Sequence, residues 1–160
     1  MIQAEKQMKK NRKNPSTMTL LLRNSGRALL TGADVGTIIG PIAADWNDSH
    51  IFNQRWPPHA RFHGVVSLGT AAALSAYGVW RLWAPSPDRG AGRDIAAAVP
   101  LAYWGSFFPA ALVKGTGVED PPHLLARVVG LPINMVIAAT ISALTLSGWL
   151  LDRRFRTSQS

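Results

Sequence analysis

Every histidine of the chain lies in or beside the stretches that connect its apolar segments. The four are His50, His59, His63 and His123, and the same stretches carry Asp45, Asp48, Glu119 and Asp120. An imidazole titrates near neutral pH, so a histidine close to a carboxylate can exchange protons with a substrate. These residue types make general acid–base chemistry the first function to consider, with His59, His63, Asp45, Asp48 and His50 as the catalytic candidates.

His59 and His63 are four residues apart, which places both imidazoles on one face of a helix. Three roles stay open for the pair. The imidazoles can form hydrogen bonds that stabilise the fold, they can exchange protons with a substrate, or they can bind a metal or haem together with His123. The chain has no cysteine and no complete metal-ligand motif, so we expect no cofactor and keep metal or haem as the alternative.

A second group of residues is suited to contact a ligand. The candidates are Trp46, Asn53, Trp56, Arg61, Tyr77, Trp104, Asn134 and Asp34. Aromatic faces attract a developing cation, and a polar group inside an apolar segment is costly unless it is paired or functional. Asp34 has the alternative of pairing with Arg27, two helical turns away. Arg55 and Arg127 lie near expected helix starts, where a lipid head group or another anion can bind. Asp120 is the expected N-cap of the last helix.

The elements that position these residues are long and uncharged. Residues 62–80, 95–113 and 128–151 contain no Lys, Arg, Asp or Glu, although the chain has a net charge of +8. A helix needs about 20 apolar residues to cross a bilayer. We therefore predict an all-α fold, an integral membrane four-helix bundle in one domain (18–152), with basic tails at 1–17 and 153–160. The expected helices span about 19–44, 58–83, 94–113 and 121–151.

The distribution of charge predicts how this bundle is oriented. An even number of helices places both termini on one side, and most Lys and Arg fall on that side, so both termini should be cytoplasmic. The histidine-rich loops would then be periplasmic, extracellular or lumenal. The cations bracket apolar segments and form no continuous stripe, which argues against nucleic acid. Gly32, Gly36 and Gly40 form a small-residue face on which a membrane partner could pack.

Two matched segments indicate an internal repeat. The sequence Pro-Pro-His occurs at residues 57–59 and again at 121–123, each time after an acidic stretch and before an expected helix. This pattern is compatible with a duplicated helix pair.

The connecting sequence also resembles a known signature. Residues 44–53 and 56–63 are similar to the D-W-N-x-S-H-x-F-N…W-P-P-H-A-R-F-H loop of an uncharacterised family of small four-helix membrane proteins. The resemblance extends over about residues 20–151. In architecture alone the chain is similar to emopamil-binding-type bundles, which hold sterol-like ligands and in some members isomerise them.

Residues and resemblance together predict a multi-pass membrane protein that binds a small sterol- or isoprenoid-like molecule. The site would lie at the non-cytosolic end, where histidine, aspartate and tryptophan gather. If the protein is an enzyme, we expect an acid–base isomerase or cyclase. The first alternative is a non-catalytic accessory subunit of a membrane complex, and the second is a protein that binds haem or a metal.

Overall fold

Four long helices make up most of the structure, a computed structural model that describes residues 17–119 and 122–157. They are α2 (Thr17–Asp45), α3 (Pro58–Trp83), α4 (Arg89–Gly105) and α6 (Ile133–Thr157). The short helix α5 (Phe107–Ala110) follows α4, and an antiparallel pair of two-residue strands, β1 (Arg127–Val128) and β2 (Leu131–Pro132), precedes α6. The expectation of a largely helical chain with four long helices is confirmed. The predicted tails lie mostly outside the described residues, although α6 continues to Thr157.

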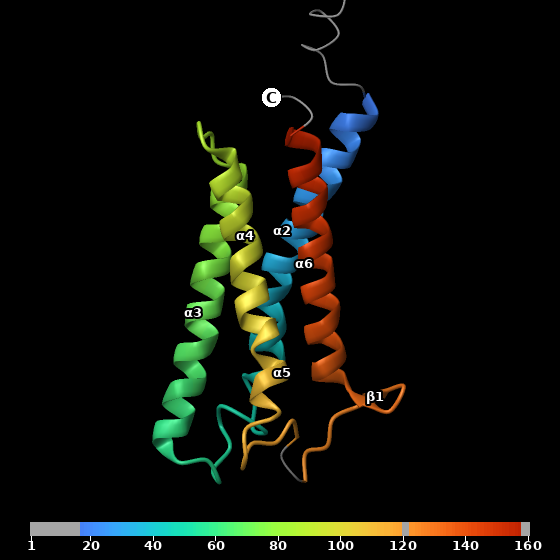
Figure 1. The fold of residues 1–160 in the computed structure, drawn as a ribbon. Helices are drawn as coiled ribbons and strands as arrows, with labels where there is room; N and C mark the ends of the chain where they lie inside the picture. Colours follow the sequence, from blue (N-terminus) through green and yellow to red (C-terminus); the bar gives the residue numbers. More distant parts are fainter. Residues whose placement is uncertain (1–16, 120–121, 158–160) are drawn as a thin grey trace, which may run out of the picture.

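The four long helices lie side by side (Figure 1). α2 and α4 each pack against all the other long helices, whereas the described parts of α3 and α6 share no close backbone contact. α2 begins and α6 ends at the same end of the structure, which we call the terminal end (Figure 1). Residues 46–57, 111–119 and 122–132 lie at the opposite end, which we call the loop end. All the stretches that carry histidines therefore meet at one end of the molecule.

Small residues allow the helices to approach closely. A Cβ on Gly26 of α2 would lie 2.9 Å from the carbonyl oxygen of Gly148 in α6, and a Cβ on Gly148 would lie 2.9 Å from that of Gly26. The predicted glycine face is partly used within the chain, because Gly36 faces Ile141 and Gly40 faces Trp104. Only Gly32 of that row has open space around it.

The third long helix is displaced from its expected position. We expected it at residues 94–113, but α4 spans Arg89–Gly105. It begins earlier because Asp88 caps it, with Asp88 Oδ1 accepting a hydrogen bond from Ala91 N at 2.9 Å. It ends at Gly105, whose carbonyl cannot accept a bond from Pro109 because proline has no N–H, and the chain continues as the short helix α5.

The last long helix begins later than we expected. Residues 122–132 are loop and strand, and α6 starts at Ile133, directly after Pro132. Val129 and Gly130 both have positive φ angles, 51° and 80°, and reverse the chain between the two strands. The second Pro-Pro-His segment therefore precedes a loop, whereas the first opens α3, so the two segments are not structurally equivalent. The expected N-cap Asp120 lies outside the described residues.

Candidate functional site

The loop that connects α2 to α3 is held together by its own polar side chains. Asn47 Nδ2 donates to the carbonyl oxygen of Ala44 at 2.6 Å, and Asn47 Oδ1 accepts from Ser49 N at 2.9 Å and from Ser49 Oγ at 2.6 Å. Ser49 Oγ also lies 2.8 Å from His50 Nδ1. Because the Ser49 hydroxyl has one proton, donating it to Asn47 leaves the oxygen to accept from His50 Nδ1–H. This network fixes the His50 ring.

Asp45 is the carboxylate nearest to His50. Asp45 Oδ1 lies 3.7 Å from His50 Nε2, and the imidazole packs edge-on against Trp56 with 5.7 Å between ring centroids. Burial raises the pKa of Asp45 above its usual value, an effect that the attraction to His50 opposes. The structure therefore places Asp45 beside His50 rather than beside the histidines of α3.

Asn53 and Ile51 anchor the loop to the helices. Both are buried, with 5% and 6% of their surface exposed. Asn53 Nδ2 donates to the Ser49 carbonyl at 3.1 Å, and Asn53 Oδ1 accepts from Arg55 N at 3.0 Å. Ile51 packs against Gly64, because a Cβ on Gly64 would come within 2.7 Å of Ile51 Cδ1. Asn53, which we expected to bind substrate, therefore stabilises the loop, while Asp48 is exposed on it.

His59 and His63 form a pair on the exposed side of α3. Their Nε2 atoms lie 3.0 Å apart, and their rings meet edge-on with 4.5 Å between centroids. One ring must donate and the other accept, so the two imidazoles share a proton at a defined position. The ring of His59 also stacks on that of Phe62 at 6.2 Å.

The described residues contain no group of three His, Cys, Asp or Glu side chains able to hold a metal ion. His123 is exposed in the loop before β1 and does not join the pair on α3. The metal alternative is left with two candidate ligands, fewer than the three or four protein ligands of zinc sites. No cofactor is indicated by this arrangement.

A groove of about 550 Å³ runs between α3 and α4. The α3 wall consists of Ser67, Thr70, Ala71 and Leu74, and the α4 wall consists of Ala98, Val99, Ala102, Tyr103 and Ser106. The hydroxyl groups of Ser67, Tyr103 and Ser106 lie towards the loop end, and the purely apolar walls lie deeper. The groove is therefore mainly apolar, with hydroxyl-bearing side chains at its loop end, where Ser106 Oγ donates to the Tyr103 carbonyl at 2.7 Å.

The histidine pair lies on the helix face that forms this groove. His63, Ser67, Thr70 and Leu74 follow one another at intervals of three or four residues, so they share one side of α3. A polar stripe on a membrane-spanning helix would be expected to face the interior of the bundle, because lipid cannot satisfy its hydrogen bonds. Ser67 and Thr70 instead line an open groove at the surface, with His63 one turn nearer the loop end.

A second and smaller groove, of about 330 Å³, lies on the other side of α3. Ile42 and Trp46 from α2 and the loop face Val65, Leu68, Gly69 and Ala72 of α3. Trp46 therefore borders a groove, as a ligand-contacting residue should, and its ring also packs edge-on against Phe52 at 5.6 Å. This groove contains no hydroxyl or charged side chain.

Two residues that we expected in the ligand site have structural contacts instead. Trp104 is 5% exposed, and its Nε1 donates to Thr37 Oγ1 at 2.8 Å, which ties α4 to α2. Asn134 is the second residue of α6, where its Oδ1 accepts from Met135 N at 2.8 Å and its Nδ2 donates to the Val118 carbonyl at 2.9 Å. Neither residue borders the two grooves.

The remaining candidates lie at the surface. Arg127 contacts Glu119 Oε1 through Nη2 at 2.7 Å, so its charge is already matched. Arg55 is exposed and Arg61 is half-buried, both near the loop end. Tyr77 is exposed beside Trp80, with 5.6 Å between ring centroids.

Asp34 does not pair with Arg27. Arg27 Nε lies 3.5 Å from Asp152 Oδ1 of α6, with the two side chains 12% and 0% exposed. The Arg27 guanidinium also lies over the ring of Trp83 at 5.4 Å from its centroid. The pairing that we considered for Asp34 is therefore wrong, and Asp34 is left fully buried in the middle of α2.

Comparison with known families identifies the family of the chain. The profile of a family described as of unknown function, DUF6640, matches residues 28–160. The chain belongs to the DUF6640 family. The match covers both grooves, the histidine pair and the loop that follows α2. No curated protein and no solved structure matches the chain.

Sequence reasoning missed the α4 half of the groove in this DUF6640 member. Ala102 and Tyr103 each lie three or four residues from both Val99 and Ser106, so the four share one helix face. That spacing was available in the sequence. It pointed to a site only once α4 was known to lie against the polar face of α3.

Proposed function

We propose that this DUF6640 protein is a multi-pass membrane protein that binds a small lipophilic molecule in the groove between α3 and α4. The single observation that carries the proposal is the composition of that groove. Ligand pockets of a few hundred Å³ are mainly apolar and contain a few polar groups that fix orientation. The groove has this composition, with hydroxyl groups at the loop end and apolar walls beyond.

The membrane part of the proposal is supported by the exposure of the helices. α3 and residues 133–154 of α6 are long and apolar enough to cross a membrane. Only 22% and 17% of their apolar windows is buried. A core helix of a water-soluble protein would be mostly buried, so these helices need an apolar surrounding.

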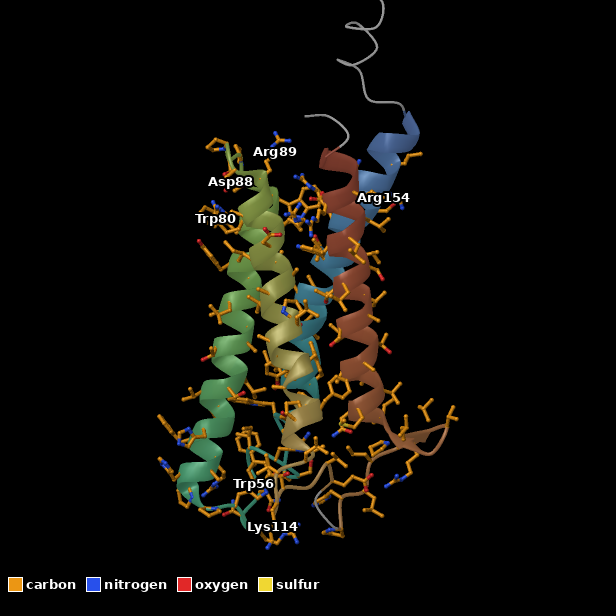
Figure 2. The ribbon with its side chains drawn as sticks, in the orientation of Figure 1. Trp56, Trp80, Asp88, Arg89, Lys114 and Arg154 are labelled. Carbon is orange, nitrogen blue, oxygen red and sulfur yellow. The ribbon has the colours of Figure 1, made fainter. Side chains whose placement is uncertain are left out.

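The ends of the molecule carry the charged and aromatic residues that suit the two interfaces. Trp56 and Lys114 lie at the loop end, and Trp80, Asp88, Arg89 and Arg154 lie toward the terminal end (Figure 2). The cations of the terminal end whose side chains are described are Arg27, Arg81, Arg89, Arg93, Arg153 and Arg154, and those of the loop end are Arg55, Arg61, Lys114 and Arg127. The excess of arginine favours a cytoplasmic terminal end.

The ligand class follows from the polarity of the groove. An apolar tail or ring system would lie along Leu74, Ala98 and Val99, and a hydroxyl or carbonyl group would contact Ser67, Tyr103 or Ser106. The histidine pair is one turn further along the same face of α3. In an enzymatic version of this function, His63 would be the group that exchanges a proton with the polar end of the ligand.

The test is photoaffinity labelling with a long-chain alcohol that carries a diazirine. The purified protein is irradiated with the probe, and adducts are mapped by mass spectrometry. Ala102→Trp should fill the α3–α4 groove and reduce the adduct yield severalfold. The matched variant Ala72→Trp, which fills the α2–α3 groove, should leave the yield unchanged.

Excess unlabelled long-chain alcohol should also compete with the probe. Adducts spread evenly over all four helices, or equal losses in Ala102→Trp and Ala72→Trp, would show that the α3–α4 groove is not a binding site.

A further inference from the structure

The interior of the molecule holds a carboxyl group without a charged partner. The Asp34 side chain is 0% exposed, and neither of its oxygens has a hydrogen-bond partner of good geometry within the described residues. At 1.5 Å per residue it lies roughly 16 Å along α2 from the loop end of that helix. Asp34 is therefore well inside the apolar part of the molecule.

Ser75 of α3 is the polar side chain that faces Asp34. It is also 0% exposed, and its hydroxyl is directed towards the carboxyl group without completing a hydrogen bond of good geometry. The helix backbones enclose the two groups closely. A Cβ on Gly78 would lie 3.2 Å from Asp34 Oδ1 and 3.3 Å from the Cα of Ala96 in α4.

The ionisable groups on the surrounding helices are engaged elsewhere. Arg27 of α2 pairs with Asp152 of α6, Asp94 of α4 accepts hydrogen bonds from Arg93 and Trp149, and Arg81 of α3 lies over the Trp80 ring. Within the described residues, no Lys, Arg or His nitrogen comes within ion-pair distance of Asp34.

An ionised carboxylate in such a place would be strongly destabilising, because neither water nor a cation offsets the loss of hydration. A protonated carboxyl group avoids this cost, and its O–H can donate to the Ser75 oxygen. We propose that Asp34 and Ser75 form a buried proton-binding site between α2 and α3, in which Asp34 is a neutral carboxylic acid at neutral pH.

The packing around Asp34 also determines what release of its proton requires. An ionised Asp34 needs water or a cation, but its side chain is 0% exposed, with the Gly78 backbone of α3 packed against it. Release of the proton therefore requires water or a cation to reach the carboxyl group. This inference does not depend on the ligand proposed for the α3–α4 groove.

Infrared spectroscopy detects the site directly, because a protonated carboxyl group has its own C=O stretching band. The purified full chain is measured at neutral pH in a detergent without ester carbonyls. The wild type should show this band, and Asp34→Asn should lose it. The matched variant Asp152→Asn, which removes a buried carboxylate paired with Arg27, should keep it.

Ser75→Ala provides a second test that does not require Asp34→Asn to fold. Loss of the hydroxyl partner should shift the carboxylic acid band to a higher frequency. The proposal would be overturned by a wild-type protein without the band at neutral pH. It would also be overturned by a band that persists in folded Asp34→Asn or that does not move in Ser75→Ala.

Discussion

Two buried aspartates show how differently one residue type can be accommodated. Asp152 lies beside the half-buried guanidinium of Arg27, so its negative charge is compensated. Asp34 faces the hydroxyl of Ser75 and the backbone of α3, and among the described residues it has no ion-pair partner. The Arg27–Asp152 pair holds the terminal end of α2 against α6. The unpaired carboxyl group of Asp34 makes the packing in the middle of the molecule depend on its protonation state.

Asp45 leads to a prediction about pH. Burial raises its pKa, so the folded state favours the neutral acid, and the stability that this preference contributes is present at low pH and lost as the pH rises through the folded pKa. The wild type should therefore lose stability relative to Asp45→Asn between about pH 4, the ordinary aspartate pKa, and neutral pH. Thermal unfolding in detergent at several pH values measures this difference.

The control for this prediction is Asp48→Asn, which removes an exposed carboxylate from the same loop. A difference between wild type and Asp45→Asn that stays constant with pH, or that Asp48→Asn reproduces, would contradict the role given to the burial of Asp45.

At the scale of the helices, glycines determine how closely α2 and α6 pack. Gly26 and Gly148 bring the two backbones together, and a Cβ on Gly26 would also lie 2.8 Å from Asp152 N. Gly32, two turns along α2, has no neighbouring atom within 4 Å of its ideal Cβ position. The two glycines therefore offer a matched pair of substitutions in one helix.

Gly26→Ala should destabilise the protein by about 1–3 kcal/mol, because the helices must separate to admit the methyl group. Gly32→Ala should be neutral or stabilising by up to about 1 kcal/mol, because alanine favours the helix. Thermal or denaturant unfolding of both variants in detergent measures these changes. Equal effects of the two substitutions would mean that the α2–α6 contact is not close. If Gly32 instead contacts a membrane partner, Gly32→Ala should weaken that assembly while the isolated chain remains stable.

The sequence predicts the middle of the helices better than their ends. Continuous apolar stretches locate α3 and the body of α6, because a helix expected to cross an apolar layer needs length and apolar composition alone. The end of α4 and the start of α6 lie inside apolar stretches, so composition alone does not locate them. Pro132 disfavours helical geometry for the residue before it, in agreement with the start of α6 at Ile133. Proline is not a sufficient signal, because Pro41 and Pro100 lie inside α2 and α4.

The candidate site was predictable only in part, because some of it depends on which helices pack side by side. The four-residue spacing of His59 and His63 predicts a contact within one helix, and the structure places their Nε2 atoms 3.0 Å apart. The groove requires α4 to lie beside α3, which no spacing within one helix can reveal. Trp104 and Asn134 were assigned to the ligand site by residue type. In the structure Trp104 donates to the Thr37 hydroxyl, and Asn134 donates to the Val118 carbonyl.

At the scale of the whole molecule, polarity is divided between the two ends. The loop end contains the described histidines together with the Asp45–His50 contact, and the terminal end contains most of the described arginines. An arrangement of this kind fits a protein that separates two aqueous compartments. The α3–α4 groove would then open its polar end towards the compartment that lies away from the cytoplasm.

The central claim is that the helices cross a bilayer with the loop end outside, and cysteine labelling tests it most directly. The chain has no cysteine, so single substitutions at Lys114 and Arg89, exposed residues at opposite ends, need no background mutations. A membrane-impermeant maleimide applied to intact cells should label Lys114→Cys and should label Arg89→Cys only after the membrane is permeabilised. Labelling of both positions in intact cells, of neither before permeabilisation, or of Arg89→Cys alone would contradict the proposed orientation.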